Sequence, residues 1–339
     1  MRIAGIAIGI TLTLSWFGGL AHAADTLKAT IEEMGGQPCR VGILTCISIN
    51  VPVDHRANSP GPTIKIEFSI SFASEESKGI LFYVVGGPGG SGIGLADDYL
   101  SAFDEKLTKN MDIVFFDQRG VGPAHGIECP KAQGVFDMAE IRVDRPDEAI
   151  ALAKQFVTDC TAELKSRDLL NYVDTEQAIR DLELFRQKIG APKVWIYGES
   201  YGTQFSQQYA TAFPTAVNGV VVDGVVDLTL DVNGFYTSYT EGAERILARV
   251  LKSCAEVPGC HRDMKGDATE AYDALAAQVA KAPIEIDFPL ADGTTAKRPS
   301  PPACWKPTPS IHFTGRTIAR PSCALWRLLR AGSLCPCCA

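Results

Sequence analysis

The sequence lacks the positive charge on which nucleic-acid binding depends. It carries 32 Lys and Arg residues against 40 Asp and Glu residues, a formal net charge of −8. No cluster of Lys and Arg offsets this balance, which excludes a nucleic-acid partner on electrostatic grounds. A nucleotide-binding loop is also missing, because no Gly-Lys-Ser/Thr sequence follows Gly92 in the glycine-rich stretch. Histidine is scarce, with five residues in the chain, so few candidates exist for a general base.

The N-terminus has the features of a secretory signal. Arg2 gives a short basic start, residues 3–20 are mostly apolar, and Ala21-His22-Ala23 has the small-x-small pattern of a cleavage site. An uncleaved membrane anchor is the alternative, but the apolar run is barely long enough to span a bilayer. We therefore expect residues 1–23 to be a signal peptide. The protein that begins at Ala24 is expected to be secreted or periplasmic, without stable membrane association.

Cysteine usage agrees with export. Six of the 11 cysteines form sequential pairs that close loops in an oxidising compartment: Cys39 with Cys46, Cys129 with Cys160, and Cys254 with Cys260. A zinc site is the competing interpretation, but this region has no Cys-x-x-Cys pair and no histidine cluster. We expect three disulfides, no metal and no cofactor.

The apolar patterns indicate an α/β fold, and 46% hydrophobic residues suffice for a sizeable core. Residues 40–53 and 62–72 alternate apolar and polar positions, which predicts an antiparallel hairpin. Nearly continuous apolar runs are typical of parallel strands covered on both faces, and they occur at residues 79–85, 112–117, 193–198 and 219–226. Helical patterns lie between them, at residues 147–165 and 175–189, the second with Asp174 or Thr175 as cap and Gly190 at its end.

This order of elements predicts a doubly wound, mostly parallel sheet preceded by an antiparallel hairpin. We expect residues 24–231 to form this core. Residues 232–297 are strongly helical and are predicted to form a partial cap inserted above the sheet.

Residues 193–210 carry the most specific signal for chemistry. Gly198-Glu199-Ser200-Tyr201-Gly202 has the form Gly-x-Ser-x-Gly, follows a strand pattern and opens a helix. This context is typical of a nucleophile elbow, where the turn is so tight that only glycine fits at the flanking positions. We therefore predict that Ser200 is a catalytic nucleophile at the carboxyl end of the sheet and at a helix N-terminus.

The glycine-rich loop after residues 79–85 suits the same chemistry. An acyl-transfer site requires two backbone N–H groups aimed at the oxyanion, and Tyr201 supplies one of them. The second donor has to approach the substrate without an intervening side chain, which explains six glycines between Gly86 and Gly94. We predict Gly87 as this donor, with Gly86 as the alternative. A flexible turn is the other interpretation of the loop.

Four motifs occur in a characteristic order: GGPGGSG (86–92), DQRGVG (117–122), GESYGT (198–203) and VVDGVVD (221–227). With them, residues 39–297 resemble the secreted tripeptidyl aminopeptidases, relatives of the prolyl aminopeptidases in the α/β-hydrolase superfamily. The resemblance implies a serine exopeptidase that releases tripeptides from free N-termini through an acyl-enzyme on Ser200. Val85 stands where the prolyl enzymes have histidine.

Charged residues accompany these motifs. We expect Asp117 and Arg119 to brace the loops around the site rather than to contact substrate. Glu199 precedes the serine as in serine carboxypeptidases, where the glutamate helps to hold a substrate carboxylate, and an acidic group suits an N-terminal ammonium equally well. The resemblance implies acidic residues in the cap that bind the amine, and Glu241 and Glu244 are candidates.

The nucleophile still requires a base, normally histidine, and a carboxylate that orients it. In this superfamily both follow the serine in the chain. Asp223 is a candidate acid, although the family usually places the acid one strand later. His261 lies beside a predicted disulfide in the cap and is expected on the surface. His312 therefore remains as the candidate base.

Residues 298–339 differ from the rest of the chain, since they contain no Asp or Glu but seven Pro and five Cys. A proline-rich tail is one interpretation, and the CPCCA ending suggests metal binding as another. We interpret the segment as a change of translation frame near Arg298. The final strands of the sheet, with the triad Asp and His, are then expected to be missing, the chain to be inactive, and the open sheet edge to favour aggregation.

Two further classes stay open. An esterase or a serine carboxypeptidase of the same fold shares the Ser200 signal, and a non-catalytic remnant or binding protein retains the sheet without the chemistry. The expected partner is a peptide with a free N-terminus. The sequence leaves open the peptide length, the favoured residues and the oligomeric state.

Overall fold

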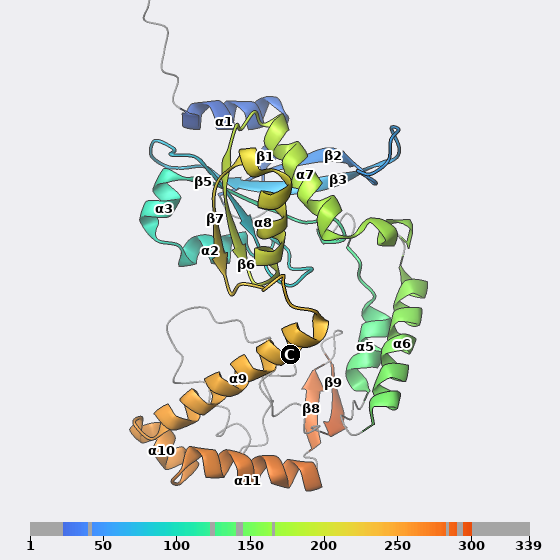
Figure 1. Cartoon of the computed structure of the whole chain (residues 1–339), viewed down its shortest axis with the longest axis vertical. Coiled ribbons are helices and arrows are strands. Elements are labelled where there is room, and N and C mark those ends of the chain that lie inside the picture. The colour runs from blue at the N-terminus through green and yellow to red at the C-terminus, as the bar shows by residue number, and fades with distance from the viewer. Residues whose placement is uncertain are drawn as a thin grey trace, which may run out of the picture.

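A mixed seven-stranded sheet forms the centre of the protein, with strand order β1-β2-β3-β5-β4-β6-β7 (Figure 1). It is seen in a computed structural model that describes residues 23–39, 43–122, 126–139, 145–164, 167–282, 285–289 and 294–299. Residues 1–22 of the predicted signal peptide lie outside these ranges. So do His312 and the predicted tail from residue 300 onward.

Four parallel strands make up the half of the sheet that carries the site. They are β5 (Asp112–Phe116), β4 (Ile80–Val84), β6 (Val194–Glu199) and β7 (Val217–Asp223). Each forms at its predicted apolar run, with shifts of a few residues at the ends. The predicted α/β class and the parallel order are therefore confirmed.

The other half of the sheet is antiparallel. It contains β1 (Gln37–Pro38), β2 (Thr45–Pro52) and β3 (Thr63–Ser71). The predicted hairpin is confirmed, because β2 pairs with β3 along its whole length, from Thr45 opposite Ile70 to Pro52 opposite Thr63. β3 then pairs antiparallel with β5 and joins the two halves.

Helices connect the strands, and those that pack on the sheet cover both of its faces. In the described ranges those of the core are α1 (Ala23–Glu33), α2 (Ala96–Ala102), α3 (Glu105–Asn110), α5 (Pro130–Met138), α6 (Pro146–Glu163), α7 (Thr175–Lys188) and α8 (Tyr201–Ala212), with 3-10 turns η1 (Arg167–Tyr172) and η2 (Pro214–Ala216). Of the two predicted caps of α7, the structure selects Asp174, whose side chain accepts the backbone N–H of Gln177 at 2.9 Å. Gly190 follows this helix with a φ of +67°, a conformation that suits glycine.

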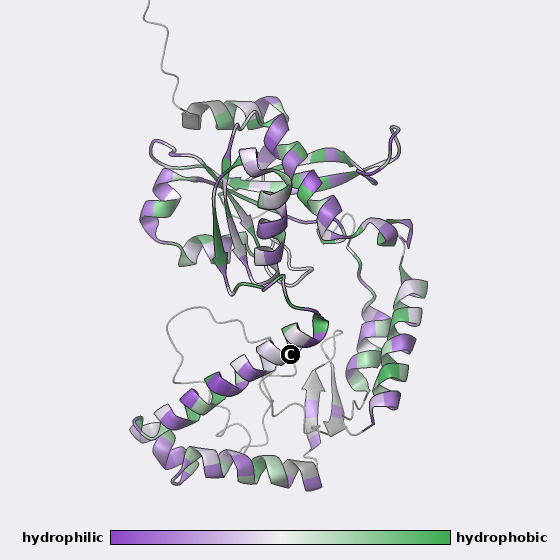
Figure 2. Cartoon of the chain, in the orientation of Figure 1, coloured by the Kyte–Doolittle hydropathy of each residue, from purple (hydrophilic) through white to green (hydrophobic). Residues whose placement is uncertain are grey.

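Alternating side chains of the strands build two apolar layers. On one face Phe82 and Val84 pack with Leu182 and Phe185 of α7 and with Phe205 of α8. On the other face the buried set is Leu81, Tyr83, Val85, Ile113 and Phe115, against which residues of α2 and α3 pack. In Figure 2 the hydrophobic residues accordingly concentrate along the central strands. The two layers fix the sheet between its helices and hold the carboxyl ends of β4 and β6 side by side.

β7 differs from the expectation that its apolar run is covered on both faces. Val220, Val221 and Val222 are 37%, 48% and 41% exposed, so this part of the prediction is wrong. The reason is position, because within the described residues β7 is the edge strand and pairs with β6 alone. Exposed β-branched residues on an unpaired edge are a template for association with other chains.

The three predicted disulfides are confirmed. Cys39, which follows β1, pairs with Cys46 in β2, Cys129 pairs with Cys160 between α5 and α6, and Cys254 pairs with Cys260. Each cross-link restricts the unfolded chain and so favours the folded state.

The predicted helical cap follows β7. It consists of α9 (Val232–Cys254), α10 (Pro258–Met264) and α11 (Ala268–Lys281), and they share a small core that includes Leu251 and Met264. In Figure 1, residues 224–231 lead from the carboxyl end of β7 to the start of α9. An antiparallel pair that the sequence did not predict, β8 (Glu285–Pro289) and β9 (Thr295–Pro299), completes this region. None of the helices in the described ranges is long and apolar enough to cross a bilayer.

Candidate active site

The predicted nucleophile lies in a strained turn between β6 and α8. Ser200 has φ +53° and ψ −118°, and it is one of two non-glycine residues with a positive φ in the described ranges. Such a conformation costs roughly 1–3 kcal/mol and persists only where the surroundings hold it in place. The strand, sharp turn and helix are those of a nucleophile elbow.

Close packing around the turn explains the two flanking glycines. A Cβ on Gly198 would overlap the carbonyl oxygen of Gly202, and a Cβ on Gly202 would overlap the carbonyl oxygen of Val84. The elbow is therefore pressed against the end of β4. Any larger residue at either position would move the serine away from the neighbouring loop.

Hydrogen bonds hold the strained residue from both sides. The Ser200 N–H donates to the carbonyl oxygen of Asp223 at 2.8 Å. The Ser200 carbonyl accepts the Thr203 N–H at 2.9 Å and the Thr203 hydroxyl at 2.7 Å. The turn is thus tied to the end of β7 and to the first turn of α8.

The glycine loop after β4 lies directly against the serine. A Cβ on Gly86 would be 2.9 Å from Ser200 Cβ and 3.5 Å from its Oγ. A Cβ on Gly87 would instead meet Gly89 and Gly90 of its own loop, and Gly87 has a φ of +127°. The structure therefore places Gly86, the alternative donor, directly against the nucleophile. The identity of the second oxyanion donor stays a prediction.

Asp117 holds this loop in place from beneath. Its buried carboxylate accepts the Ser91 hydroxyl at 2.7 Å and the Ile93 N–H at 3.2 Å through the same oxygen. Ser91 Oγ in turn accepts the Gly94 N–H at 2.8 Å. These contacts fit the bracing role expected for Asp117.

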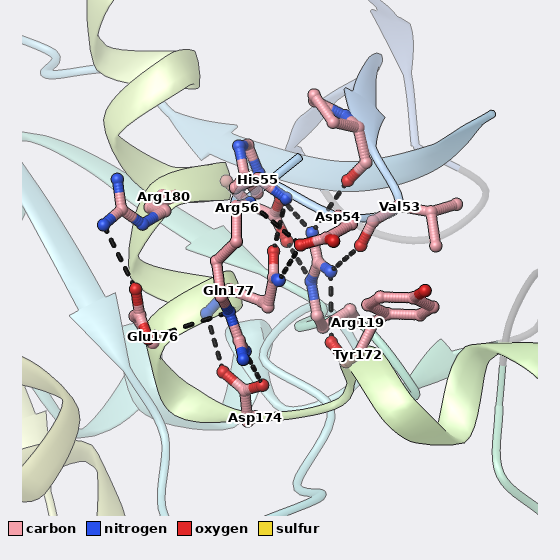
Figure 3. A network of polar contacts seen from close by, with 12 residues as sticks. Val53, Asp54, His55, Arg56, Arg119, Tyr172, Asp174, Glu176, Gln177 and Arg180 are labelled. Carbon is pink, nitrogen blue, oxygen red and sulfur yellow. Dashed lines mark hydrogen bonds and ion pairs between the residues drawn. The ribbon is translucent and has the colours of Figure 1, made fainter. Parts of the chain in front are cut away.

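Arg119 braces a different part of the molecule. Its side chain is 1% exposed and forms a bidentate ion pair with Asp181 of α7, with N···O distances of 2.8 and 2.6 Å. It also donates to the carbonyl oxygens of Pro52, Val53 and Tyr172 (Figure 3). Asp117 and Arg119 are therefore not a pair, and each joins separate segments.

The sequence reasoning missed the other members of this network. His55 Nε2 lies 2.7 Å from Asp181 Oδ1, and the His55 N–H donates to Gln177 Oε1 at 2.8 Å. The turn between β2 and β3 is in this way tied to α7 (Figure 3). No local pattern could have found these partners, since His55 and Asp181 are 126 positions apart in the sequence.

Glu199 is held by two tyrosines. Its Oε2 accepts the hydroxyl of Tyr99 at 2.6 Å and that of Tyr83 at 3.0 Å. Burial, reinforced by the charge of Glu199, raises the pKa of both tyrosines, so both remain hydrogen-bond donors at neutral pH. The two hydrogen bonds thereby fix the Glu199 carboxylate beside the nucleophile. The role of Glu199 in substrate binding stays a prediction.

Asp223 has a similar partner. Its Oδ2 accepts the Tyr197 hydroxyl at 2.7 Å, and burial together with this hydrogen bond raises the pKa of Tyr197 to about 12. The Asp223 backbone carbonyl binds the Ser200 N–H. The contact of Asp223 with the elbow is thus made by its main chain, and its role as triad acid stays a prediction.

The described residues bring no histidine to Ser200. His55 is bound to Asp181, and His261 lies in α10 of the cap. No hydrogen bond of Ser200 Oγ is found in these parts of the chain. They also contain no group of three or more His, Cys, Asp and Glu side chains arranged to hold a metal ion.

The candidate amine-binding residues are both on α9. Glu241 makes an exposed ion pair with Arg245 at 3.7 Å. Glu244 is close enough to Tyr272 of α11 to raise the pKa of that tyrosine, after the larger effect of burial. The arrangement does not distinguish between them.

Comparison with known proteins agrees with this geometry. Residues 80–249 match the family described as "alpha/beta hydrolase fold". The chain is 29% identical over 214 residues to "Serine protease Hip1" of Mycobacterium tuberculosis, covering 59% of this chain and 40% of that protein. It is 32% identical over 173 residues to "Tripeptidyl aminopeptidase" of Streptomyces lividans, covering 47% and 31%.

A third relative has a different name. "Carboxylesterase B" of Mycobacterium tuberculosis is 27% identical over 201 residues, covering 50% of this chain and 38% of that protein. The chain thus spans between 31% and 40% of the length of these three relatives.

Proposed function

The chain belongs to the α/β-hydrolase fold family, and from that premise we propose that it is the core of an exported serine exopeptidase that releases tripeptides from free N-termini. The observation that carries the proposal is the conformation of Ser200. Ser200 stands in the turn between β6 and α8 with φ +53° and ψ −118°, and it lies against Gly86 and is hydrogen-bonded to the end of β7. A strained serine held in this way fits a preorganised, exposed nucleophile.

The chemistry follows from the elbow. Ser200 Oγ attacks the substrate carbonyl carbon while its proton passes to a base, and the carbonyl electron pair moves onto oxygen. The backbone N–H groups of Tyr201 and of Gly86 or Gly87 stabilise this oxyanion. The C–N bond then breaks as the base returns the proton to the leaving amine. Water hydrolyses the acyl-enzyme in the reverse sequence of proton transfers.

The base for these steps does not lie among the described residues. Loss of the triad histidine reduces turnover on the order of a millionfold in subtilisin, the example from which this magnitude is taken. We propose that the 339-residue chain is inactive for this reason, unless His312 supplies the base. Translating the coding DNA around codons 290–340 in all three frames tests the proposed inactivity. An alternative frame that continues with a late Asp and His supports the proposal. If no such frame exists, His312 is left as the candidate base.

Recognition of a free amine is supported by the relative named tripeptidyl aminopeptidase and by the presence of Glu199 beside the nucleophile. Glu241 and Glu244 stand on the helix that follows β7, and Glu199 lies beside the nucleophile. A carboxylate attracts an ammonium group and repels a substrate carboxylate. We therefore assign Glu199, with Glu241 or Glu244, to binding of the N-terminus of the peptide.

The esterase alternative has its own support in the relative named carboxylesterase B. Peptide binding to a Ser200→Ala variant separates the candidates without requiring turnover. We expect calorimetry to detect a hexapeptide with a free N-terminus and to detect no binding after N-acetylation. Equal binding of both forms favours an esterase, loss on C-terminal amidation favours a carboxypeptidase, and no binding of any form favours a non-catalytic remnant.

Export is supported by the three disulfides, which persist in oxidising compartments. Expression in a bacterium with a functional secretion system tests it. We expect the protein outside the cytoplasm with Ala24 as its first residue. Retention in the cytoplasm with residue 1 intact would count against export.

A further inference from the structure

Thr203 makes contacts that neither the nucleophile motif nor the comparisons assign. We propose that Thr203 is a positioning residue that aims the oxyanion-binding N–H of Tyr201 and couples it to the segment leading into the cap. The proposal rests on the proposed function in one respect, because it takes the Tyr201 N–H as an oxyanion donor. The contacts themselves are independent of any reaction.

The Thr203 hydroxyl is completely buried, with a residue exposure of 0%. It donates to the Ser200 carbonyl oxygen at 2.7 Å and accepts the Val226 N–H at 2.8 Å. Since a hydroxyl has one proton to donate, the acceptor of that proton is fixed as the Ser200 carbonyl. The side chain thus bridges two backbone groups that are 26 residues apart in numbering, Ser200 and Val226.

Peptide geometry gives this bridge its significance. The Ser200 carbonyl and the Tyr201 N–H belong to one planar peptide group and point in opposite directions. A hydrogen bond that fixes the direction of the carbonyl therefore fixes the direction of the N–H. Thr203 donates two hydrogen bonds to the Ser200 carbonyl, one from its N–H and one from its hydroxyl, and these direct the carbonyl toward α8. The Tyr201 N–H of the same peptide group therefore points away from α8.

The second end of the bridge is anchored as well. Gln207, one turn further along α8, donates to the Val226 carbonyl oxygen at 3.0 Å. Both backbone groups of Val226 are therefore bound by side chains of the helix that carries the nucleophile at its N-terminus. Val226 lies in the connection between β7 and α9. The Thr203 hydroxyl consequently links the segment that leads into the cap directly to the carbonyl of the oxyanion peptide.

A neighbouring residue shows that this arrangement is specific to Thr203. The Ser206 hydroxyl is also buried on α8 and donates to the Gly202 carbonyl at 2.7 Å. That bond is the ordinary one between a helical hydroxyl and the carbonyl four residues earlier. Ser206 does not contact the Ser200–Tyr201 peptide, which makes Ser206→Ala a matched control for the loss of a buried hydroxyl.

Hydrogen-exchange mass spectrometry of the full chain tests the proposal. Thr203→Val removes the hydroxyl and retains the size, whereas Thr203→Ser retains the hydroxyl. We expect Thr203→Val to accelerate exchange about tenfold or more in peptides covering residues 199–203 and 224–228. Thr203→Ser and Ser206→Ala are expected to exchange as the unsubstituted protein does in both segments. Exchange in residues 63–71 of β3 reports whether the rest of the sheet is intact.

The outcomes separate positioning from general support. Unchanged exchange in Thr203→Val, an equal acceleration in Ser206→Ala, or failure of Thr203→Ser to restore protection overturns the proposal. If Thr203→Val does not fold, Thr203→Ala removes the hydroxyl without placing a second methyl group near Val226 and is measured instead. Because exchange requires no catalysis, an inactive protein leaves this result valid, and failure of the proposed function is recognised separately by the peptide-binding experiment.

Discussion

Replacing Arg119 by leucine tests the structure directly, because the buried Arg119 side chain makes several hydrogen bonds that leucine cannot make. The guanidinium is 1% exposed and makes two hydrogen bonds to Asp181 and three to backbone carbonyls. Arg119→Leu leaves the Asp181 carboxylate, itself 1% exposed, beside His55, whose Nε2 lies 2.7 Å from Asp181 Oδ1. The substitution thus buries a charge whose main counterion is gone.

The magnitude follows from this arrangement. Removing one partner of a buried ion pair costs about 3–5 kcal/mol, out of a total stability of roughly 5–15 kcal/mol for a protein of ordinary size. The double variant Arg119→Leu/Asp181→Leu no longer contains the unpaired carboxylate. We therefore expect it to be less destabilised than the sum of its two single substitutions by about 2 kcal/mol or more.

Urea unfolding followed by circular dichroism measures these differences. Arg180→Leu is the matched control, because Arg180 lies on the same helix as Asp181 but pairs with Glu176 at the surface. The side chains of Arg180 and Glu176 are 43% and 49% exposed. Its loss should cost less than about 1 kcal/mol. The reasoning is refuted if Arg119→Leu costs no more than Arg180→Leu, or if the double variant shows the sum of the single effects.

Three further predictions concern separate parts of the structure. Burial raises the pKa of Glu183, but hydrogen bonds from Arg186, Tyr209 and Gln187 outweigh it and lower the pKa below the ordinary 4.5. Glu183→Gln should therefore lose stability at neutral pH, and the difference in unfolding free energy should shrink only below pH 4.5; a constant difference down to pH 3 would contradict this. Replacing both Cys129 and Cys160 by serine opens a loop of sequence separation 31 and should cost about 3–4 kcal/mol in urea unfolding, whereas no loss would show that the bond does not form. Val221→Lys on the exposed edge of β7 should reduce aggregation measured by light scattering with little change in stability, and unchanged aggregation would mean that this edge is not its cause.

Much of the fold was predictable because hydrophobic periodicity reports how a segment is covered. The hairpin of β2 and β3 and the strands β4, β5 and β6 follow directly from their patterns. The exposure of β7 was not predictable in this way. Its valines indicate a strand suited to burial, but a pattern does not show whether another segment is available to cover it.

The site was predictable to a similar degree. Ser200 could be identified because the elbow compresses strand, turn and helix into five consecutive residues. Thr203, which holds Ser200, and Tyr99, which holds Glu199, could not, because their partners are backbone groups without a residue signature or are distant in sequence. The position of Gly86 against Ser200 likewise depends on how the loop folds back on itself.

The most direct test of the central claim is labelling of the purified chain with a fluorophosphonate, since this reagent reacts with an activated serine. The adduct is located by peptide mapping, with Ser200→Ala and His312→Ala as controls. The claim that the core presents Ser200 without a base predicts labelling at the background level of Ser200→Ala. Stoichiometric labelling of Ser200 within minutes would contradict it, and loss of that labelling in His312→Ala would identify the base.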